Sequence, residues 1–390
     1  MSKKITAGIF GFGVVGEGLY RLVRETAYPS LDFKAIVVKE KNKKRILPEE
    51  RFSYDDCVIL GDPEIELVIE VTNDSKAAFK IVKAALENGK HVVSANKRMI
   101  AEHLEELIEV QKASGKLLLY EAAVAGAVPI VQTTDQYLAW QKISKIEGIL
   151  NGTSNYILTE MNAGRSFDEA LRDAQLKGYA EADPTMDIAG HDALFKTIIL
   201  ALHGFGKLVK PEDVFFAGIQ RVNTADIEWG KSKNLVVKQT GNITQSEDNF
   251  ELSVTPVFLP GESKLGNVHD VLNAVEVQTN VAGNFVLEGE GAGAFPTAQA
   301  VLGDIEKIGH GISYTLNKGA EAATPKGKVW DVYLRTDTPS VLESLSFIDI
   351  DEETKTHEQV RIVGKIHSDE LKKLTQVQKN HLFIARIQYN

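Results

Sequence analysis

The sequence lacks the features that mark secreted, membrane-spanning and nucleic-acid-binding proteins. Among its 390 residues there is a single cysteine, Cys57, so no intramolecular disulfide and no thiolate metal cluster can form. No apolar run approaches the roughly 18 residues that a membrane-spanning helix needs. The formal net charge of −10 gives no general attraction to nucleic acid or to acidic membrane surfaces. We therefore expect a soluble protein of the reducing cytoplasm.

The composition is that of an ordinary globular protein, and the length suits two or three domains. Hydrophobic residues make up 43% and charged residues 25% of the chain. Up to about residue 135, strand-like apolar runs alternate with amphipathic segments, which indicates a doubly wound parallel sheet. The expected strands are 5–10, 33–38, 66–72, 91–96 and 116–123, and the expected helices are 17–27, 76–89 and 102–115.

The pattern changes beyond this region and predicts a second domain of α+β type at 136–290. Strands of a different sheet are expected at 142–150 and 250–259, with helices near 166–178 and 191–205 between them.

A third part of the pattern concerns the end of the chain. A Gly-rich turn and a helix at 291–316 are expected to return to the first domain at 1–135. A stretch rich in Lys, Gly, Thr and Pro at 317–328 is typical of a linker, and a small tail domain is predicted at 326–390.

Gly11, Gly13 and Gly16 form a G-x-G-x-x-G turn between a predicted strand and a predicted helix. In that context the first glycine permits the tight turn, and the second lets the backbone approach a pyrophosphate. The third allows the helix to pack closely on the strand, while the helix N-terminus favours the phosphate charge. This context favours a nicotinamide dinucleotide site over a tight turn without a ligand.

The end of the second predicted strand is where such folds distinguish NAD from NADP. An acidic side chain there bonds the ribose 2′-hydroxyl of NAD, whereas basic groups accept the 2′-phosphate of NADP. The sequence offers both, because Lys39 precedes Glu40 and more basic residues follow at 41 and 43–45. Lys39 favours NADP, but a solvated charged loop explains the cluster equally well, so the choice stays open.

Asp192 and Lys196 are spaced i and i+4 in a predicted helix that is apolar on nearly every face over 193–205. An exposed pair of this kind is usually a solvated salt bridge, but a buried pair is expensive to desolvate and favours a functional site. Hydride transfer to an aldehyde leaves an alkoxide that needs a proton, which a buried lysine can supply. Glu181 and Asp187 on the preceding loop are placed to bind a cationic amino group, although loop acids alone are usually just solvated.

Five blocks of the sequence resemble those of homoserine dehydrogenases and occur in that family's order. They are GFGVVG at 11–16, SANKR at 94–98, GILNGTSNYIL at 148–158, GYAEADPTMDIAGHDALFK at 178–196 and GEGAGAFPTAQAV at 289–301. The third and fourth blocks are long and specific. The resemblance implies an NAD- or NADP-dependent enzyme that interconverts L-aspartate 4-semialdehyde and L-homoserine, in the biosynthesis of threonine, methionine and isoleucine.

The resemblance also implies roles for individual residues. Lys196 corresponds to the proton donor, and Asp192 to its partner and a substrate ligand. Further implied substrate ligands are Gly178, Glu181 and Asp187. Besides the three glycines, the implied cofactor contacts are Val14, Val15, Thr72 and Gly293, and Lys97 is implied to contact the cofactor or the substrate.

The segment 121–128 resembles the family's loop for a monovalent cation. Backbone carbonyls of Val124, Gly126 and Val128, with Glu121 nearby, would hold sodium through the oxygen ligands that hard cations favour. The resemblance further implies a homodimer whose interface lies in the second domain.

The tail is similar to the ACT module, a βαββαβ unit that longer family members carry. Its strands are expected at 328–336, 346–353, 358–366 and 381–388, and its second helix at 367–378. The module's D-x-P-G-V-L turn is matched only in part, because Ser340 replaces the glycine, and the first helix is short. We therefore expect a degenerate module, with weak or absent effector binding, appended to a complete catalytic unit.

Two other interpretations share part of this pattern. Another amino-acid-linked dehydrogenase would have the glycine turn but would not predict the block at 178–196. A non-catalytic nicotinamide sensor would be expected to have lost Lys196 or Asp192, and both are present.

Overall fold

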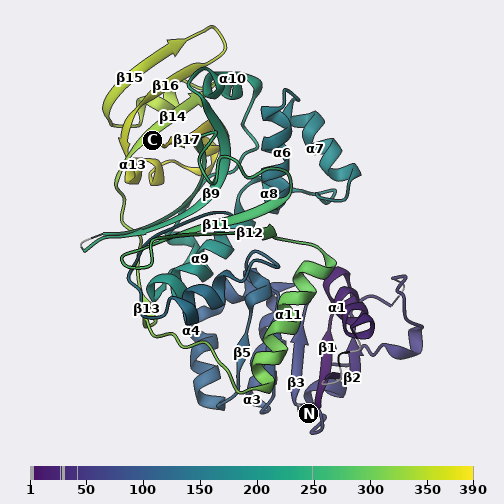
Figure 1. Cartoon of the computed structure of the whole chain (residues 1–390). Helices are drawn as coiled ribbons and strands as arrows, with labels where there is room; N and C mark the ends of the chain where they lie inside the picture. The colour runs from purple at the N-terminus through teal and green to yellow at the C-terminus, as the bar shows by residue number, and fades with distance from the viewer. Residues whose placement is uncertain (1–3, 27, 29–30, 42, 248, 390) are drawn as a thin grey trace. The chain divides into compact units, whose positions relative to one another are not determined.

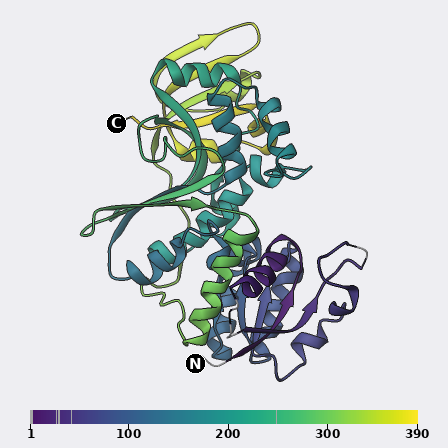
Figure 2. The same cartoon turned by 45° about the vertical axis from the view of Figure 1, so that its right-hand side comes forward.

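The computed structural model describes residues 4–26, 28, 31–41, 43–247 and 249–389 (Figures 1 and 2). The chain divides into two compact units. The first combines Met1–Trp140 with Glu290–Ala320, and the second combines Gln141–Gly289 with Glu321–Asn390. No helix among the described residues is long and apolar enough to cross a membrane.

The first unit is built on a parallel sheet with the strand order β2-β1-β3-β4-β5. The strands are β1 (Ile5–Phe10), β2 (Leu31–Val37), β3 (Leu67–Glu70), β4 (His91–Ser94) and β5 (Leu118–Leu119). Because β1 has β2 on one side and β3 on the other, the order reverses at β1, and the carboxyl end of β1 is the place where such sheets bind ligands. The predicted doubly wound sheet is confirmed.

Helices surround this sheet. They are α1 (Val14–Glu25), α2 (Cys57–Leu60), α3 (Ser75–Glu87), α4 (Lys97–Ser114), α5 (Ile130–Gln132) and α11 (Ala294–Gly309), with a short π-helix at Thr133–Tyr137 and 3₁₀ turns at Glu49–Arg51 and Glu121–Ala123. α11 packs on α1, and a Cβ on Gly18 would lie 2.6 Å from the carbonyl oxygen of Ala294. α11 therefore packs within the first unit.

Two of the predicted boundaries in this unit that differ from the structure have a clear physical cause. The helix expected at 102–115 begins at Lys97, because the side chain of Asn96 caps it by accepting the Met99 N–H at 3.0 Å. The strand expected over 116–123 is only two residues long. Its continuation turns away because the backbone N–H of Glu121 donates to Asp304 on α11 at 2.7 Å.

The second unit is built on a mixed sheet with the order β12-β11-β6-β9-β10-β17-β14-β16-β15, in which β8 also pairs with β10. Its strands before the tail are β6 (Ile143–Ile149), β7 (Lys207–Leu208), β8 (Phe215–Phe216), β9 (Leu235–Gln245), β10 (Phe250–Pro260), β11 (Leu272–Thr279) and β12 (Asn284–Glu290). Its helices before the tail are α6 (Gly152–Asn162), α7 (Phe167–Leu176), α8 (Thr185–Ile188), α9 (His191–Phe205) and α10 (Thr224–Ser232), with a 3₁₀ turn at Pro211–Asp213.

α9 is the buried helix that the sequence predicts. Every residue from Asp192 to Phe205 is buried, and the helix packs against β6, β9 and β10. Gly190 and Gly206 flank it in the left-handed conformation, with φ of 88° and 68°, which glycine adopts at little cost.

The tail continues the sheet of the second unit instead of forming a separate module. Its elements are β13 (Glu321–Ala322), β14 (Val329–Thr336), α12 (Ser340–Glu343), β15 (Phe347–Lys355), β16 (Val360–His367), α13 (Ser368–Lys372), α14 (Gln376–Asn380) and β17 (Leu382–Ile387). From β14 onward they follow the βαββαβ order, with a first helix of only four residues and the second helix split in two. The linker is also partly regular, since β13 pairs with β7.

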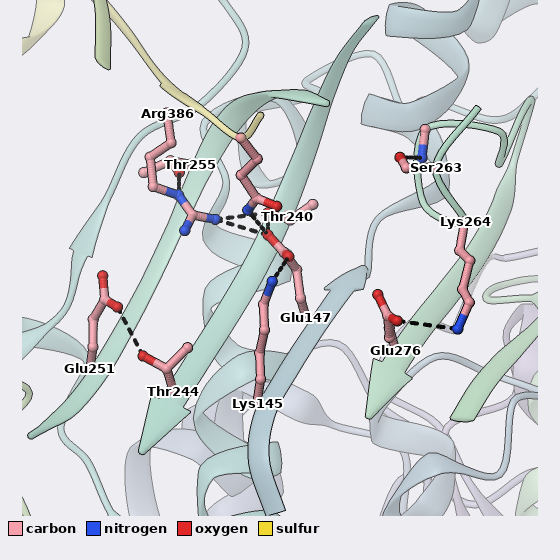
Figure 3. Close-up of polar contacts among 12 residues, drawn as sticks. Lys145, Glu147, Thr240, Thr244, Glu251, Thr255, Ser263, Lys264, Glu276 and Arg386 are labelled. Atoms are coloured by element: carbon pink, nitrogen blue, oxygen red, sulfur yellow. Dashed lines mark hydrogen bonds and ion pairs between the residues drawn. The ribbon is translucent and has the colours of Figure 1, made fainter. Parts of the chain in front are cut away.

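The attachment of the tail has a clear physical cause. β17 pairs with β10, and Tyr333 and Phe383 share one hydrophobic core with Val237 and Phe258. Arg386 on β17 also donates to Glu147 on β6 at 3.0 Å (Figure 3). Both the main chain and buried side chains therefore tie the tail to the strands of the second unit.

Candidate active site

The centre of the candidate site is a buried ion pair on α9. Nζ of Lys196 lies 2.8 Å from Oδ2 of Asp192, one helical turn earlier, and both side chains are less than a tenth exposed. Nζ of Lys196 also donates to the carbonyl oxygen of Leu150, the residue after β6, at 2.6 Å. The structure thus confirms the predicted spacing and burial of the pair and adds a backbone acceptor.

An asparagine at the start of α6 connects this pair with the preceding loop. Nδ2 of Asn151 donates to Oδ2 of Asp192 at 2.9 Å and to Oδ1 of Asp187 at 2.8 Å. The hydroxyl of Ser154 donates to the backbone carbonyl of Asp187 at 3.0 Å. Asp187 is therefore brought to the pair, as the sequence led us to expect.

The other two expected substrate ligands lie apart from this cluster. Gly178 and Glu181 are exposed on the loop between α7 and α8. Within the described part of the chain, no hydrogen bond or ion pair engages the carboxylate of Glu181. This loop is supported from α6, because the Thr153 hydroxyl donates to the carbonyl of Tyr179 at 2.6 Å.

In the first unit, the glycine turn follows β1 and its three glycines differ in their surroundings. Gly11 has φ of +96°, and a Cβ there would lie 2.8 Å from the carbonyl oxygen of Val71. A Cβ on Gly16 would lie 2.4 Å from the carbonyl oxygen of Gly11, whereas one on Gly13 would have no atom within 4 Å. Open space at the second glycine and close packing at the other two fit a pyrophosphate at Gly13.

Two helix N-termini reinforce that fit. Neither the N-cap of α1, Gly13, nor the N-cap of α11, Gly293, carries a side-chain cap, so their first N–H groups are left for another acceptor. The starts of the two helices are neighbours, as the approach of Gly18 to Ala294 shows. Val14, the first residue of α1, is 69% exposed, and Val15 beside it is half-buried. The donor groups therefore suit an anionic dinucleotide.

The carboxyl ends of β3 and β4 are joined by a polar network around Glu70. The carboxylate of this fully buried residue accepts from the N–H of Thr72 at 2.8 Å and from its hydroxyl at 2.6 Å. It also accepts from the Ser94 hydroxyl at 2.7 Å, and Asn96 donates to the Thr72 carbonyl at 3.1 Å. Burial raises the pKa of Glu70. Thr72 and the start of α4 at Lys97 are thereby fixed beside each other.

Lys39 lies just beyond β2 with its side chain 86% exposed. Its Nζ is 3.5 Å from Oδ2 of Asp74, a residue that caps α3 through the N–H of Ala77. That backbone hydrogen bond is the main cause that lowers the pKa of Asp74. The Lys39 ammonium is thus held weakly and is accessible to a ligand.

The expected cation loop is buried and closely packed. Ala125 and Gly126 have φ of 54° and 52°, and a Cβ on Gly126 would lie 2.6 Å from the carbonyl carbon of Gly291. Among the described residues, no hydrogen bond reaches the carbonyl oxygens of Val124 and Gly126, whereas that of Val128 accepts from an N–H at 2.8 Å. Two free, buried carbonyls are the oxygen donors that sodium prefers.

Glu121, the fourth expected member of this loop, is already engaged. Its two carboxylate oxygens accept the N–H groups of Val131 and Gln132 at 2.9 and 2.8 Å. Burial and the nearby Asp304 raise its pKa. The described residues contain no group of three His, Cys, Asp or Glu side chains that could hold a metal.

Comparisons with known proteins agree on one family. A family model described as homoserine dehydrogenase matches residues 129–305, and one described as its NAD binding domain matches residues 11–121. A homoserine dehydrogenase of Pseudomonas aeruginosa is 35% identical over 314 residues, which cover 78% of this chain and 72% of the relative. The chain belongs to the homoserine dehydrogenase family. A Synechocystis relative is 38% identical over 79% of this chain and 73% of its own length.

Solved homoserine dehydrogenases have the same fold. The enzyme of Thiobacillus denitrificans aligns over 100% of this chain and 99% of its own, with a TM-score of 0.85 at 29% identity. A hyperthermophilic archaeal homoserine dehydrogenase, solved in complex with NADPH, aligns over 80% of this chain and 99% of its own, with a TM-score of 0.68 at 26% identity. The first unit thus corresponds to an NAD(P)-binding domain of this oxidoreductase family.

Two residues in these clusters were not singled out from the sequence. Asn151 lies in the block GILNGTSNYIL, and an asparagine followed by Gly-Thr-Ser is a recognisable N-cap pattern. The pattern predicts the cap but not the two carboxylates that the side chain also binds. Glu70 had no such signal, because an acid inside an apolar strand gives no indication of its partners.

Proposed function

We propose that Lys196 and Asp192 carry the proton transfer in the reversible reduction of L-aspartate 4-semialdehyde to L-homoserine. The observation that supports this is the buried ion pair at 2.8 Å, with the Leu150 carbonyl as a second acceptor. A bound nicotinamide supplies the hydride to the aldehyde carbon. The carbonyl oxygen then becomes an alkoxide and takes a proton from the Lys196 ammonium, whose position Asp192 maintains. In the reverse direction, neutral Lys196 accepts the proton of the alcohol.

We assign substrate binding to the loop between α7 and α9. Asp187 and Asp192 are held side by side by Asn151 and together present the negative charge that an α-amino group requires. Glu181 and Gly178 complete the site by resemblance to the family. Because the carboxylate of Glu181 is exposed, its role requires a substrate that reaches it or a change of the loop on binding.

We assign dinucleotide binding to the glycine turn and its surroundings in the first unit. A pyrophosphate would be held at Gly13 and the starts of α1 and α11, where Val14, Val15 and Gly293 would provide N–H groups. Thr72 and Lys97 would contact the rest of the cofactor. The accessible ammonium of Lys39 favours NADP, which agrees with the NADPH bound to the archaeal relative.

We also propose a sodium ion at the loop 121–128. The free carbonyls of Val124 and Gly126 support it, and Val128 has a second lone pair available. The carboxylate of Glu121, in the same loop, would balance the ion's charge. Activity measured in sodium, potassium and a bulky organic cation tests this site, and equal rates in all three would contradict it.

A homodimer and a cytoplasmic location complete the proposal. Cross-strand pairing puts Glu147, Asn242 and Ser253 on one face of the central strands. Within the described chain the amide of Asn242 and the hydroxyl of Ser253 have no hydrogen-bond partner, but both are buried inside the single chain, so the homodimer is proposed from the resemblance to the family. Light scattering measures the mass in solution, and the mass of a single chain for the wild-type protein would contradict the dimer.

The exposed thiol of Cys57 suits a reducing compartment.

We propose that the tail at 326–390 is related to the ACT module and binds an effector weakly or not at all. The βαββαβ order and the strand order β17-β14-β16-β15 support the relation. The four-residue α12, which begins at Ser340, supports weak or absent effector binding. Strong inhibition of the enzyme by threonine that is lost on truncation of the tail would contradict the second part.

The decisive assay follows the change of absorbance of the nicotinamide near 340 nm. Purified full-length protein is mixed with L-homoserine and NAD or NADP, and in the reverse direction with aspartate semialdehyde and the reduced cofactors. We expect turnover in both directions and a higher kcat/KM with NADP. No turnover with either cofactor would refute the reaction, and a clear preference for NAD would refute only the role of Lys39.

A further inference from the structure

The amide of Asn151 contacts both carboxylates of the cluster, Asp187 and Asp192. It is 6% exposed and follows Leu150, whose carbonyl accepts from Lys196. Its Nδ2 donates to the two carboxylates, and its Oδ1 accepts the backbone N–H of Ser154 at 2.7 Å as the N-cap of α6. One side chain thus serves a helix and two acids at once.

The helix cap determines how this amide is oriented. A primary amide has two N–H donors and one carbonyl acceptor, and here all of them are used. If the amide were reversed, its oxygen would face two carboxylates and its NH₂ would face the Ser154 N–H. Both contacts would be repulsive, so the cap at Ser154 directs the two donors of Asn151 toward Asp187 and Asp192.

We propose that Asn151 is a positioning residue for the proton transfer, holding the Asp192 carboxylate against Lys196 and keeping Asp187 beside it. The inference rests on the proposed roles of Lys196 and Asp192. Oδ2 of Asp192 is shared between the ammonium at 2.8 Å and the amide at 2.9 Å, so rotation of the carboxylate would break one contact or both. The amide is neutral, so it donates to the acids without competing with the lysine for charge.

The first turn of α6 holds the same loop at two further points. The Ser154 hydroxyl donates to the Asp187 carbonyl, and the Thr153 hydroxyl donates to the Tyr179 carbonyl. These contacts keep the main chain of the loop in place without Asn151. Loss of the Asn151 donors should therefore disturb the carboxylates more than it disturbs the fold.

The alternative is that Asn151 only caps α6, and the substitution Asn151→Asp separates the two roles. Aspartate caps helices as well as asparagine does, so folding and the melting temperature should change little. It has no N–H donor, however, and its charge lies next to Asp187 and Asp192. We expect kcat for homoserine oxidation to fall about 10- to 100-fold, the range for a lost hydrogen bond to a charged group. KM for the cofactor should be unchanged.

The pH profile provides a measurement that a purely structural role would not move. Homoserine oxidation needs neutral Lys196, and the negative charge that Asn151→Asp adds favours the ammonium form. The acid limb of the kcat profile should therefore shift to higher pH in the variant. Asn223→Asp is the matched control, because Asn223 caps α10 by the same type of bond and lies outside the cluster. It should leave both kcat and the pH profile unchanged.

The kinetic results for the Asn151 variants either support or overturn the inference. Wild-type kcat together with an unshifted acid limb in Asn151→Asp would overturn the inference. If that variant does not fold, Asn151→Ser decides, since serine also caps but can donate to only one carboxylate. A fully active Asn151→Ser would then overturn it, and a folded, slowed one would support it. Lys196→Ala measured in parallel shows whether the proposed proton transfer itself fails.

Discussion

The glycine turn of the first unit and the Asp192 cluster of the second unit are built from different parts of the chain. At the turn, backbone N–H groups and empty space form the site, and the side chains at Gly11, Gly13 and Gly16 are reduced to hydrogen. In the cluster, side-chain charge forms the site, and each charged group has a buried partner. The turn therefore depends on the absence of side chains, whereas the cluster depends on how its charged side chains are paired.

The same difference appears between two ion pairs of identical spacing. Asp173 and Lys177 on α7 are separated by four residues, as Asp192 and Lys196 are on α9. The side chain of Lys177 is 47% exposed and that of Lys196 is 8% exposed. An exposed ion pair contributes little to stability, because water solvates both charges. A buried ion pair loses that water and is stable only where hydrogen-bond partners compensate for the loss. Burial, more than spacing, distinguishes the candidate catalytic pair.

The strongest test of this contrast is to remove each lysine in turn. Lys196→Ala should lower kcat by about 10²–10⁴, the usual contribution of a general acid, while cofactor binding stays nearly intact. Lys177→Ala should leave kcat within about twofold, because its ion pair is screened by water. Steady-state kinetics at 340 nm and cofactor fluorescence measure both. Near-normal turnover of Lys196→Ala would remove this residue from the mechanism.

A double variant sharpens the result. Asp192→Ala should also lower kcat, because the ammonium loses its buried counter-charge. Since the two side chains interact directly, the variant lacking both should lose less than the product of the two single losses. Strictly multiplicative losses would show that Asp192 and Lys196 act independently.

The glycine turn can be tested by a comparison within itself. A side chain on Gly13 meets open space in the protein, so Gly13→Val should fold normally but fill the place of the pyrophosphate and abolish dinucleotide binding. Gly16→Ala should do the reverse and destabilise the fold, because its Cβ would lie 2.4 Å from a backbone oxygen. Cofactor titration and thermal unfolding separate the two effects.

Gly303→Ala is the matched control for this pair. Gly303 lies within α11, and a Cβ there also meets no atom within 4 Å, but it is not part of the turn. The substitution should keep cofactor affinity and stabilise the helix by up to about 1 kcal/mol. Unchanged affinity in Gly13→Val would show that the turn is only structural.

A buried ion pair also joins the tail to α10, outside the Asp192 cluster. Asp226 on α10 is fully buried and accepts from Arg335 on β14 at 2.7 and 2.9 Å and from the Tyr333 hydroxyl at 2.7 Å. Asp226→Ala leaves a buried guanidinium unpaired and should reduce the free energy of unfolding by about 3–5 kcal/mol. Because these residues are outside the cluster, kcat at low temperature should stay near the wild-type value.

A control and a truncation complete this test. Arg221→Ala removes an exposed ion pair with Asp337 and should change stability by less than about 1 kcal/mol. Truncation after Ala320 removes β17 from the side of β10 and Arg386 from Glu147, so we expect poor folding. A stable, active truncated protein would show that the tail is the separate module that the sequence suggests.

The sequence predicted best where one local rule decides the structure. The glycine turn and the buried helix α9 follow from residue type and spacing, as does the doubly wound sheet. Boundaries failed where a distant partner decides them. The strand expected to continue to residue 123 stops because Glu121 bonds to Asp304, a residue 183 positions later.

The candidate site was predictable to the same extent. The Asp192–Lys196 spacing is local and was visible, but the contact between Asn151 and Asp192 spans 41 residues. The prediction of a separate tail module was wrong for the same reason. The order of strands and helices in the tail does not show that β17 will pair with β10. Patterns along the chain predict elements well, and they predict partners poorly.

The smallest expected effect concerns Lys39 and the choice of cofactor. Its side chain is 86% exposed, so an ion pair with a 2′-phosphate would be screened and worth at most about 1 kcal/mol. Lys39→Ala should therefore raise KM for NADP by up to about fivefold and leave KM for NAD unchanged. The effect should shrink as salt is raised, since screening weakens exposed charge pairs. Lys44→Ala, in the same exposed loop, is the matched control and should change neither KM. An equal rise for both cofactors, or the same rise in Lys44→Ala, would show that general charge rather than Lys39 determines the preference.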